Sequence, residues 1–128
     1  MENTLIRQDI DQETWTSERC FIRERLNDPS VSDVSLAETR VEPGVTTELH
    51  RLTINEWYIM SSGIGLMEVG DEEPFRVEPG DVVVIPADTS QRISNTGDED
   101  LLFQCICMPR FTPESYESLE QDNYGDNQ

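Results

Sequence analysis

The sequence predicts an all-β fold, a sandwich or a barrel, formed by a single domain. The first observation is a series of about nine short runs of β-branched and aliphatic residues, separated by turn residues about every 8–12 positions. The second is the length, because 128 residues is the size of one domain with one hydrophobic core. The third is the alternation of side chains along these runs, which gives each predicted strand one inward face. A closed antiparallel barrel would bring these faces together around one cavity.

The predicted strands follow one another from residue 19 onward. Residues 19–26 alternate, with Cys20, Ile22 and Glu24 on one face, and the turn at 27–30 ends the run. The strand at 34–41 ends at the Glu-Pro-Gly turn of residues 42–44. The almost uninterrupted apolar run 81–85 indicates a strand that is buried on both faces. Further strands are expected at 45–53, 56–61, 65–69, 75–77, 90–95 and 101–108.

A short C-terminal helix is expected after the last strand. Thr112 is a suitable N-cap, Pro113 suits the first helical position, and Glu114 places a negative charge in the first turn. Tyr116 and Leu119 would attach this helix to the barrel. The chain then divides into an N-terminal arm and edge strand at 1–33, a barrel at 34–110, and a short helix with a loose acidic tail at 111–128.

The charge balance excludes several classes of function. The chain has 27 acidic residues and nine basic residues, all of them arginine, for a net charge of −18. Without lysine there is no Schiff-base or phosphate-loop lysine. The negative charge disfavours nucleic acid and anionic membranes as partners, because their phosphates would be repelled. It indicates a solubilising acidic shell, or a source adapted to high salt.

The sequence also indicates a cytoplasmic location. Its N-terminus lacks the basic start and apolar run of a secretory signal, and no apolar run is long enough to span a membrane. The odd number of cysteines favours free thiols in a reducing compartment. Cys20, Cys105 and Cys107 are expected to be small buried side chains, in preference to a metal or redox site.

Two stretches of the chain share a characteristic spacing. In the first, five residues separate Gly44 from His50, and Leu52, Glu56 and Gly63 follow at fixed intervals. In the second stretch, five residues separate Gly80 from Pro86, and Asp88, Gln91 and Asn95 follow at fixed intervals.

This paired spacing resembles the motifs of the cupin superfamily, G-x5-H-x-H-x3,4-E-x6-G and G-x5-P-x-G-x2-H-x3-N. Leu52 and Gln91 stand where the motifs have histidines, and Asp88 stands at the turn glycine, where a tolerated left-handed residue or a reshaped loop is expected. The resemblance implies a small single-domain cupin, often labelled sugar-phosphate isomerase-like, with a double-stranded β-helix or jelly-roll barrel and a degenerate metal site. It also implies a homodimer, with strand 19–26 covering the edge of the partner's sheet.

The resemblance, together with the alternation of side chains, selects the candidate site residues. It implies that His50, Glu56 and Gln91 hold a divalent ion, which could be iron, manganese, nickel or zinc, since Leu52 cannot ligate. Glu56 and Tyr58 are the candidate catalytic residues, because they share a face and can exchange protons. Gln91 could instead hold a substrate hydroxyl group, and Met60 and Ile93 would complete the substrate-binding wall.

Three functions remain open at this stage. The first is a metal-dependent cupin enzyme, such as an isomerase, a lyase or a dioxygenase-like protein, that acts on a small polar organic molecule. The second is a metal-free cupin that binds or senses a small molecule. The third is a metal-free epimerase or isomerase that works by acid–base chemistry through His50 and Glu56.

Overall fold

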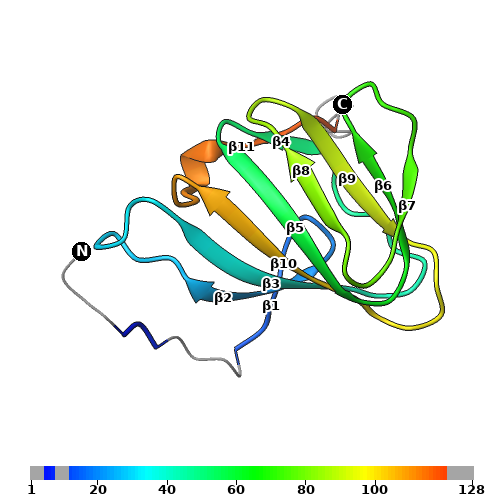
Figure 1. Ribbon diagram of the computed structural model, residues 1–128, viewed down its shortest axis with the longest axis horizontal. Helices are drawn as coiled ribbons and strands as arrows, with labels where there is room; N and C mark the ends of the chain where they lie inside the picture. Colours follow the sequence, from blue (N-terminus) through cyan, green and yellow to red (C-terminus); the bar gives the residue numbers. More distant parts are fainter. Residues whose placement is uncertain (1–4, 8–11, 121–128) are drawn as a thin grey trace, which may run out of the picture.

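Two antiparallel β-sheets form the body of the molecule (Figure 1), which the computed structural model describes at residues 5–7 and 12–120. The six-stranded sheet contains, in spatial order, β1 (Thr14–Trp15), β2 (Phe21–Leu26), β3 (Ser35–Val41), β10 (Leu101–Met108), β5 (Asn55–Ser62) and β8 (Val82–Ile85). The five-stranded sheet contains β11 (Tyr116–Ser118), β4 (His50–Leu52), β9 (Ser90–Asn95), β6 (Gly65–Val69) and β7 (Phe75–Val77). The predicted all-β architecture is therefore confirmed.

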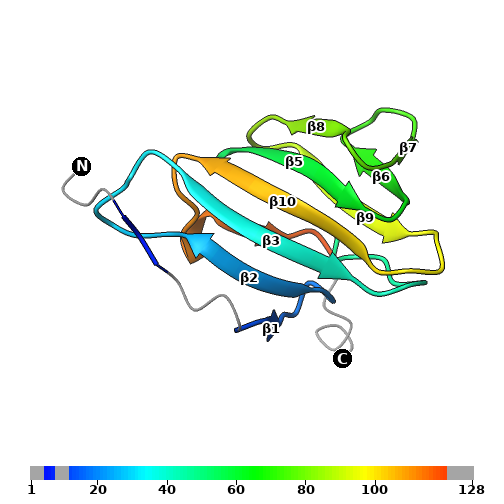
Figure 2. The same ribbon diagram turned by 60° about the horizontal axis from the view of Figure 1, so that its bottom comes forward.

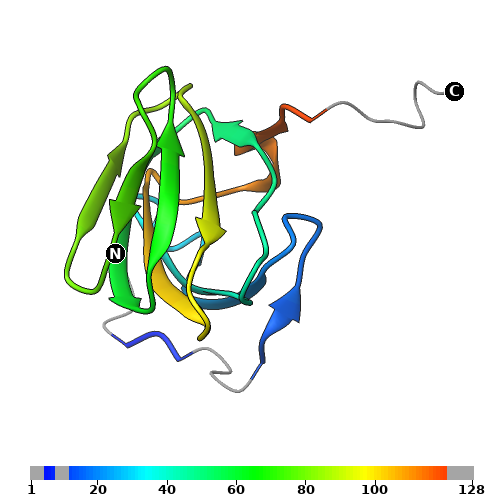
Figure 3. The same cartoon turned by 90° about the vertical axis from the view of Figure 1, so that its right-hand side faces the viewer.

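The core lies where the inward faces of the two sheets meet. Tyr58 and Phe103 come from the six-stranded sheet, and Met67 and Ile93 come from the five-stranded sheet. Figures 2 and 3 show the strands of both sheets curving around this interior. The buried amide of Asn95 stabilises one end of it, because Nδ2 donates to the carbonyls of Val41 and Glu99, each at 2.8 Å.

The predicted short C-terminal helix is present, but it is only one turn long. Pro113–Ser115 forms a single turn of 3₁₀-helix after Thr112, and Tyr116 then begins strand β11. The physical reason is that β4 has a free edge here, and Tyr116 pairs with Leu52 across it, which satisfies more backbone groups than an isolated helical turn would. The predicted loose tail at 121–128 lies outside the described residues.

The apolar run at 81–85 is buried on one face only, contrary to the prediction. Val83 and Ile85 face the interior, but Val82 and Val84 are 57% and 59% exposed. Strand β8 is at the edge of its sheet, and nothing in the described part of the chain covers its outer face. A continuous apolar run cannot distinguish a central strand from such an edge.

Strand β2 pairs with β3 on one side, whereas on its other side β1 pairs only with Phe21 and Ile22. That this strand covers the edge of a partner's sheet stays a prediction. The homodimer itself stays a prediction, and light scattering at micromolar concentration would check it. Within residues 5–7 and 12–120 there is no helix of the length and apolarity that crossing a bilayer requires.

The turn residue of the second motif has the predicted conformation. Asp88 has a φ of 65°, in the left-handed region that aspartate tolerates better than most residues. Its backbone amide donates to the carbonyl of Leu52 at 2.7 Å, which joins this turn to β4. The turn therefore holds the start of β9 beside β4, where His50 and Gln91 pair.

Substitution of Gly63 by alanine is expected to destabilise the fold more than the same substitution of Gly80. Both glycines have positive φ, 85° and 95°, which should cost alanine about 1–2 kcal/mol. At Gly63 the added Cβ would also lie 2.7 Å from the carbonyl oxygen of Asp100, whereas at Gly80 it meets nothing within 4 Å. Urea unfolding of the two variants checks this, and equal losses would contradict the steric argument.

Candidate functional site

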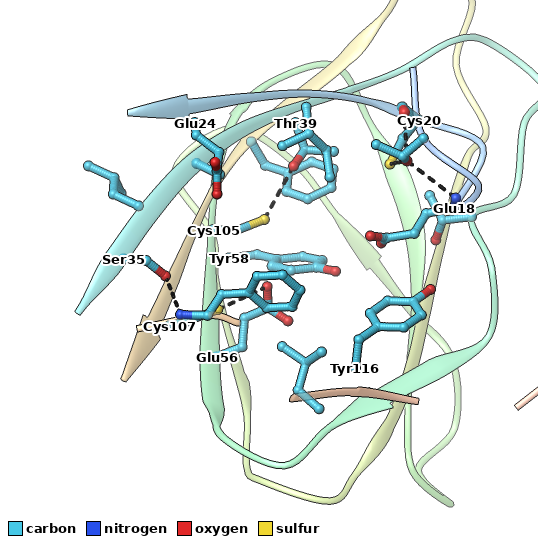
Figure 4. Close-up of a pocket in the computed structure, with 18 of the residues that line it drawn as sticks. Glu18, Cys20, Glu24, Ser35, Thr39, Glu56, Tyr58, Cys105, Cys107 and Tyr116 are labelled. Carbon is cyan, nitrogen blue, oxygen red and sulfur yellow. Dashed lines mark hydrogen bonds between the residues drawn. The ribbon is translucent and has the colours of Figure 1, made fainter. Parts of the chain in front are cut away.

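A cavity of about 560 Å³ lies inside the barrel, between the two sheets (Figure 4). Its walls come from β2, β3, β5 and β10 on one side and from β4 and β11 on the other. The segment that precedes β2 contributes further side chains. Residues that are distant in the sequence therefore meet in one cavity, and among them are His50, Glu56 and Tyr58 from the first motif.

His50 is held in one orientation. Its side chain is buried, and Nδ1 donates to the backbone carbonyl of Glu48 at 2.8 Å. The Tyr116 ring stacks on the imidazole, with ring centroids 4.7 Å apart. Burial lowers the pKa of His50 below its ordinary value. The imidazole is therefore neutral at pH 7, and Nε2 carries an available lone pair.

Glu56 is a buried carboxyl group at the centre of a short hydrogen-bond chain. The residue is 7% exposed, and Oε1 accepts from Nε2 of Gln91 at 2.8 Å. Oε1 of Gln91 in turn accepts from the Tyr58 hydroxyl at 2.6 Å. Burial raises the pKa of Glu56 to about 7, so this carboxyl group changes its protonation near neutral pH.

The two predicted catalytic residues are thus linked through Gln91. Tyr58 lines the cavity, but its hydroxyl proton is donated to Gln91, and burial raises its pKa well above the ordinary value. The phenol therefore stays protonated near neutral pH. Of the two, Glu56 is better placed to exchange a proton with a bound molecule.

The structure does not bring Met60 and Ile93 to the cavity. They are 2% and 0% exposed and belong to the hydrophobic core. Alternation correctly gives their inward direction, but other core side chains fill the barrel at their depth. Gln91 is 1% exposed and supports Glu56 from behind the cavity wall.

Two residues of this cavity were missed because they lie outside the motifs. Glu18, before β2, is half-buried, with Oε1 4.0 Å from Nε2 of His50. Burial, and then the charges of Glu56 and Glu48, raise its pKa to about 7. Glu18 precedes Cys20 and Ile22 at every second position, but the turn at Arg19, with a φ of 69°, separates it from β2, so strand alternation does not predict its direction.

Tyr116, the second missed residue, comes from β11. Besides stacking on His50, it donates its hydroxyl hydrogen bond to the Glu48 carboxylate, to which Ser118 also donates at 2.9 Å. The Tyr116 hydroxyl is therefore engaged with Glu48, while its ring closes one wall of the cavity. The sequence predicted that Tyr116 attaches a helix to the barrel, so its position in the cavity wall was not expected.

The three free cysteines all line the cavity. Cys107 contacts Oε2 of Glu56 at 3.7 Å, and Cys105 contacts the Thr39 hydroxyl at 3.4 Å. Burial raises the pKa of each thiol, that of Cys20 to about 12. These groups therefore stay protonated thiols, which agrees with the predicted structural role.

The residues proposed for a divalent ion do not fit one. Gln91 directs its amide nitrogen toward Glu56, and its oxygen already accepts from Tyr58. Leu52 lines the cavity with a hydrocarbon side chain. Within residues 5–7 and 12–120, no group of three or more His, Cys, Asp and Glu side chains is arranged to hold a metal ion. Of the predicted set of His50, Glu56 and Gln91, only two side chains have a metal-binding atom available in this arrangement, and the assignment of an ion to them stays a prediction.

Replacement of Tyr58 by phenylalanine is expected to cost about 1–3 kcal/mol of stability, since it leaves the buried Oε1 of Gln91 without its donor. Chemical denaturation measures the loss. Replacement of Tyr116 by phenylalanine is the matched control, because Glu48 keeps its hydrogen bond from Ser118. A loss no larger than in this control would show that the Tyr58–Gln91 hydrogen bond contributes little.

Comparison with known proteins identifies the family. Residues 37–107, more than half of the chain, match the family model of the cupin domain. The chain belongs to the cupin family. Its barrel is the double-stranded β-helix of that family, as the resemblance of the two motifs predicted.

The cupins that this chain is similar to do not assign a reaction to it. An uncharacterized protein of Methanocaldococcus jannaschii, MJ1618, is 38% identical over 82% of this chain and 86% of its own length. Oxalate decarboxylase OxdC of Bacillus subtilis is 32% identical over 73% of this chain, but the match spans only 26% of the decarboxylase. An uncharacterized double-stranded β-helix protein of Klebsiella pneumoniae superposes with a TM-score of 0.73, covering 94% of this chain and 100% of that protein. At 15% identity that structure shows the shared fold alone.

Proposed function

We propose that this cupin binds a small polar organic molecule directly through its cavity side chains. The observation that supports this most is the 560 Å³ cavity, whose volume is in the range of ligand-binding sites. Its wall is largely apolar, with a few polar groups that converge on the interior, which is the usual pattern of a small-molecule site. The donor atoms that a bound metal would need are partly missing or already used, so the proposed contacts are made by the protein itself.

Acid–base catalysis is the second candidate function. Neutral His50 presents Nε2 near Glu18, and Glu18 and Glu56 both have pKa values of about 7. Groups that titrate near neutral pH are efficient proton donors and acceptors. A bound molecule could therefore gain a proton from one carboxyl group and lose one to His50, as in an epimerase or isomerase.

Oxalate, the substrate named for one relative, is not favoured here. No arginine is among the described residues that line the cavity, and the chain has no lysine. A dicarboxylate would face Glu18 and Glu56 with no positive side chain to bind it. The proposed ligand is therefore not a small dianion.

A library of small polar molecules, tested for thermal stabilisation, examines the proposal. A molecule present at 100 times its Kd should stabilise the protein by about 2.7 kcal/mol. Ala37 lines the cavity, so Ala37→Phe would occupy part of it without removing a polar group, and the stabilisation should be lost. Leu66→Phe on the exposed face of β6 is the control and should leave it intact.

Two results would contradict the proposal. One is the absence of any saturable ligand, and the other is a ligand that stabilises the Ala37→Phe variant as well as the original protein. For each ligand that is found, NMR of the mixture over time separates the two candidate functions. Conversion of the ligand that is lost in His50→Gln and Glu56→Gln favours the acid–base enzyme, whereas an unchanged ligand favours a binding protein.

A further inference from the structure

We propose that the ligand of this cavity is an organic cation, a small amine whose ammonium group lies between Glu18 and Glu56. This inference rests on the proposed function, since it names the chemical class of the molecule that the cavity binds. It is carried by the side chains of the cavity wall and by the absence of a positive side chain among them. Figure 4 shows several of these groups, among them Glu18, Glu56 and Tyr58.

The cavity contains carboxyl groups without a counter-charge. Glu18 and Glu56 both point into the cavity from opposite walls (Figure 4). Only 7% of Glu56 is exposed. The nearest basic nitrogen to Glu18 given by the structure is Nε2 of His50 at 4.0 Å, and this imidazole is neutral at pH 7. Glu56 accepts from a neutral amide and contacts a thiol. Burying ionised carboxylates without a partner is costly, so both groups take up a proton near neutral pH, and a positive ligand would allow them to ionise.

The arginines of the chain are used elsewhere. Several pair with carboxylates at or near the surface, as in Arg19–Glu120 at 2.6 Å, Arg40–Glu13 at 2.9 Å, Arg51–Glu117 at 2.9 Å and Arg92–Glu68 at 2.9 Å. None of these arginines lines the cavity. The chain therefore neutralises acids on its outside, while Glu18 and Glu56 inside the cavity have no positive partner and could bind a cation from solution.

The rest of the wall suits the body of an organic ammonium ion. Tyr58 and Phe103 pack with ring centroids 4.4 Å apart, and Phe111 and Tyr116 line the same cavity. Aromatic faces attract organic cations by their quadrupole. Ile22, Leu36 and Leu52 add apolar surface for an alkyl chain. A bare metal ion would use none of these groups.

Binding of an amine should release protons from the protein. Other ionisable groups face the two carboxyls: Cys20, Glu24, Glu48, His50, Tyr58, Cys105, Cys107 and Tyr116. The thiols and phenols among them have raised pKa values and stay protonated between pH 5 and 8. The proton therefore leaves Glu18 or Glu56 when the ammonium ion arrives, because a positive neighbour favours the ionised carboxylate.

Three probes of similar shape and different charge test the inference: cyclohexylamine, cyclohexanol and cyclohexanecarboxylate. Isothermal titration at pH 7.5 is expected to show the amine binding at least about tenfold more tightly than the alcohol, and the carboxylate most weakly of the three. Titrations in two buffers of different ionisation enthalpy should show proton release with the amine only.

Variants that remove single carboxyl groups test whether Glu18 and Glu56 attract the amine. Glu18→Gln and Glu56→Gln should each weaken the amine by about tenfold or more while changing the alcohol little. Glu72→Gln, in the exposed loop between β6 and β7, removes the same net charge and should leave all three affinities unchanged. Circular dichroism confirms that each variant is folded before titration.

The possible failures are distinguishable. Tighter binding of the alcohol or the carboxylate than of the amine would overturn the inference of a cationic ligand. It would leave the proposed small-molecule function standing. An equal loss of amine affinity in Glu72→Gln would also overturn it, because the attraction would then come from the overall negative charge. Binding of none of the three probes, with no ligand found in the library, would overturn both proposals.

Discussion

Replacement of Glu56 by glutamine is expected to stabilise the protein at pH 8 by about 3 kcal/mol and to change its stability little at pH 5. Glutamine has nearly the same shape as glutamic acid, and its carbonyl oxygen can still accept the hydrogen bond from Gln91. What the substitution removes is a buried negative charge. The effect is large because Glu56 is only 7% exposed and has no cationic partner among the contacts described.

The direction of the pH dependence follows from proton binding by Glu56 in the folded and unfolded states. Burial raises the pKa of Glu56 from 4.5 to about 7 in the folded protein, whereas the unfolded chain keeps the ordinary value. Between these two values the folded state binds more protons, so stability decreases as the pH rises. The contribution of Glu56 to stability is fully present below about pH 4.5 and is lost as the pH rises through 7. Glu18 acts in the same direction, and its pKa depends partly on the charge of Glu56.

Other groups act in the opposite direction at lower pH. The lowered pKa of His50 means that stability is lost as the pH falls through the folded value of that pKa. Glu13 and Glu120 have lowered pKa values because Arg40 and Arg19 bond to them, and their contributions are lost only in acid. The decrease in stability between pH 5 and 8 therefore comes from Glu18 and Glu56, and His50 offsets part of it below its ordinary pKa of 6.5.

Urea unfolding at pH 5, 6, 7 and 8 measures the effect in the original protein, Glu56→Gln and Glu72→Gln. The original protein and the Glu72→Gln control should lose stability with rising pH, and Glu56→Gln should lose much less. A variant whose stability follows the same pH curve as the original protein would show that Glu56 ionises normally. Acidic side chains that lower stability at neutral pH are typical of functional sites, which agrees with the proposed role of this cavity.

The spacing of the two motifs correctly predicted that His50, Glu56 and Gln91 lie close together. His50 and Gln91 are register partners on β4 and β9, and Gln91 reaches Glu56 on β5, so residues far apart in the chain do converge. Alternation gives the face of a strand, and it does so correctly for Glu56 and Tyr58. It does not give the depth at which a side chain lies, which is why Met60 and Ile93 were assigned to a cavity that other core residues close off.

The residues that sequence reasoning missed depend on contacts made late in the chain or outside its motifs. Tyr116 reaches His50 only because β11 pairs with the free edge of β4, a choice that no local pattern in residues 112–119 reveals. Glu18 reaches the same imidazole from the segment before β2. A potential ligand such as Gln91 is recognisable in sequence, but the direction of its amide depends on Tyr58 and Glu56, which the fold must first bring together.

Restoration of two histidines is expected to create the metal site that the motif implies. In Leu52→His/Gln91→His, the new imidazoles would stand beside His50 and Glu56, giving the four donors of the cupin motifs. Leu52 shares the inward face of β4 with His50, and residue 91 is opposite His50 across the strand pair. Imidazole and carboxylate donors suit zinc, iron, nickel and manganese.

The original protein should bind these ions weakly, and the double variant should bind at least one of them about 100-fold more tightly or better. Loss of residues that only support the ligands already lowers metal affinity 10–100-fold, so gain of two ligands should have at least this effect. Titration of metal-free protein with each ion, together with elemental analysis, measures the difference. Adding His50→Ala to the double variant should abolish the gain, which separates the designed site from adventitious binding to the acidic surface. Thermal melting shows whether the polar replacement of buried Leu52 is tolerated. If the original protein binds an ion as tightly as the double variant, then the hydrogen bonds of Gln91 do not prevent ligation, and the metal-dependent function returns as the better explanation of this cavity.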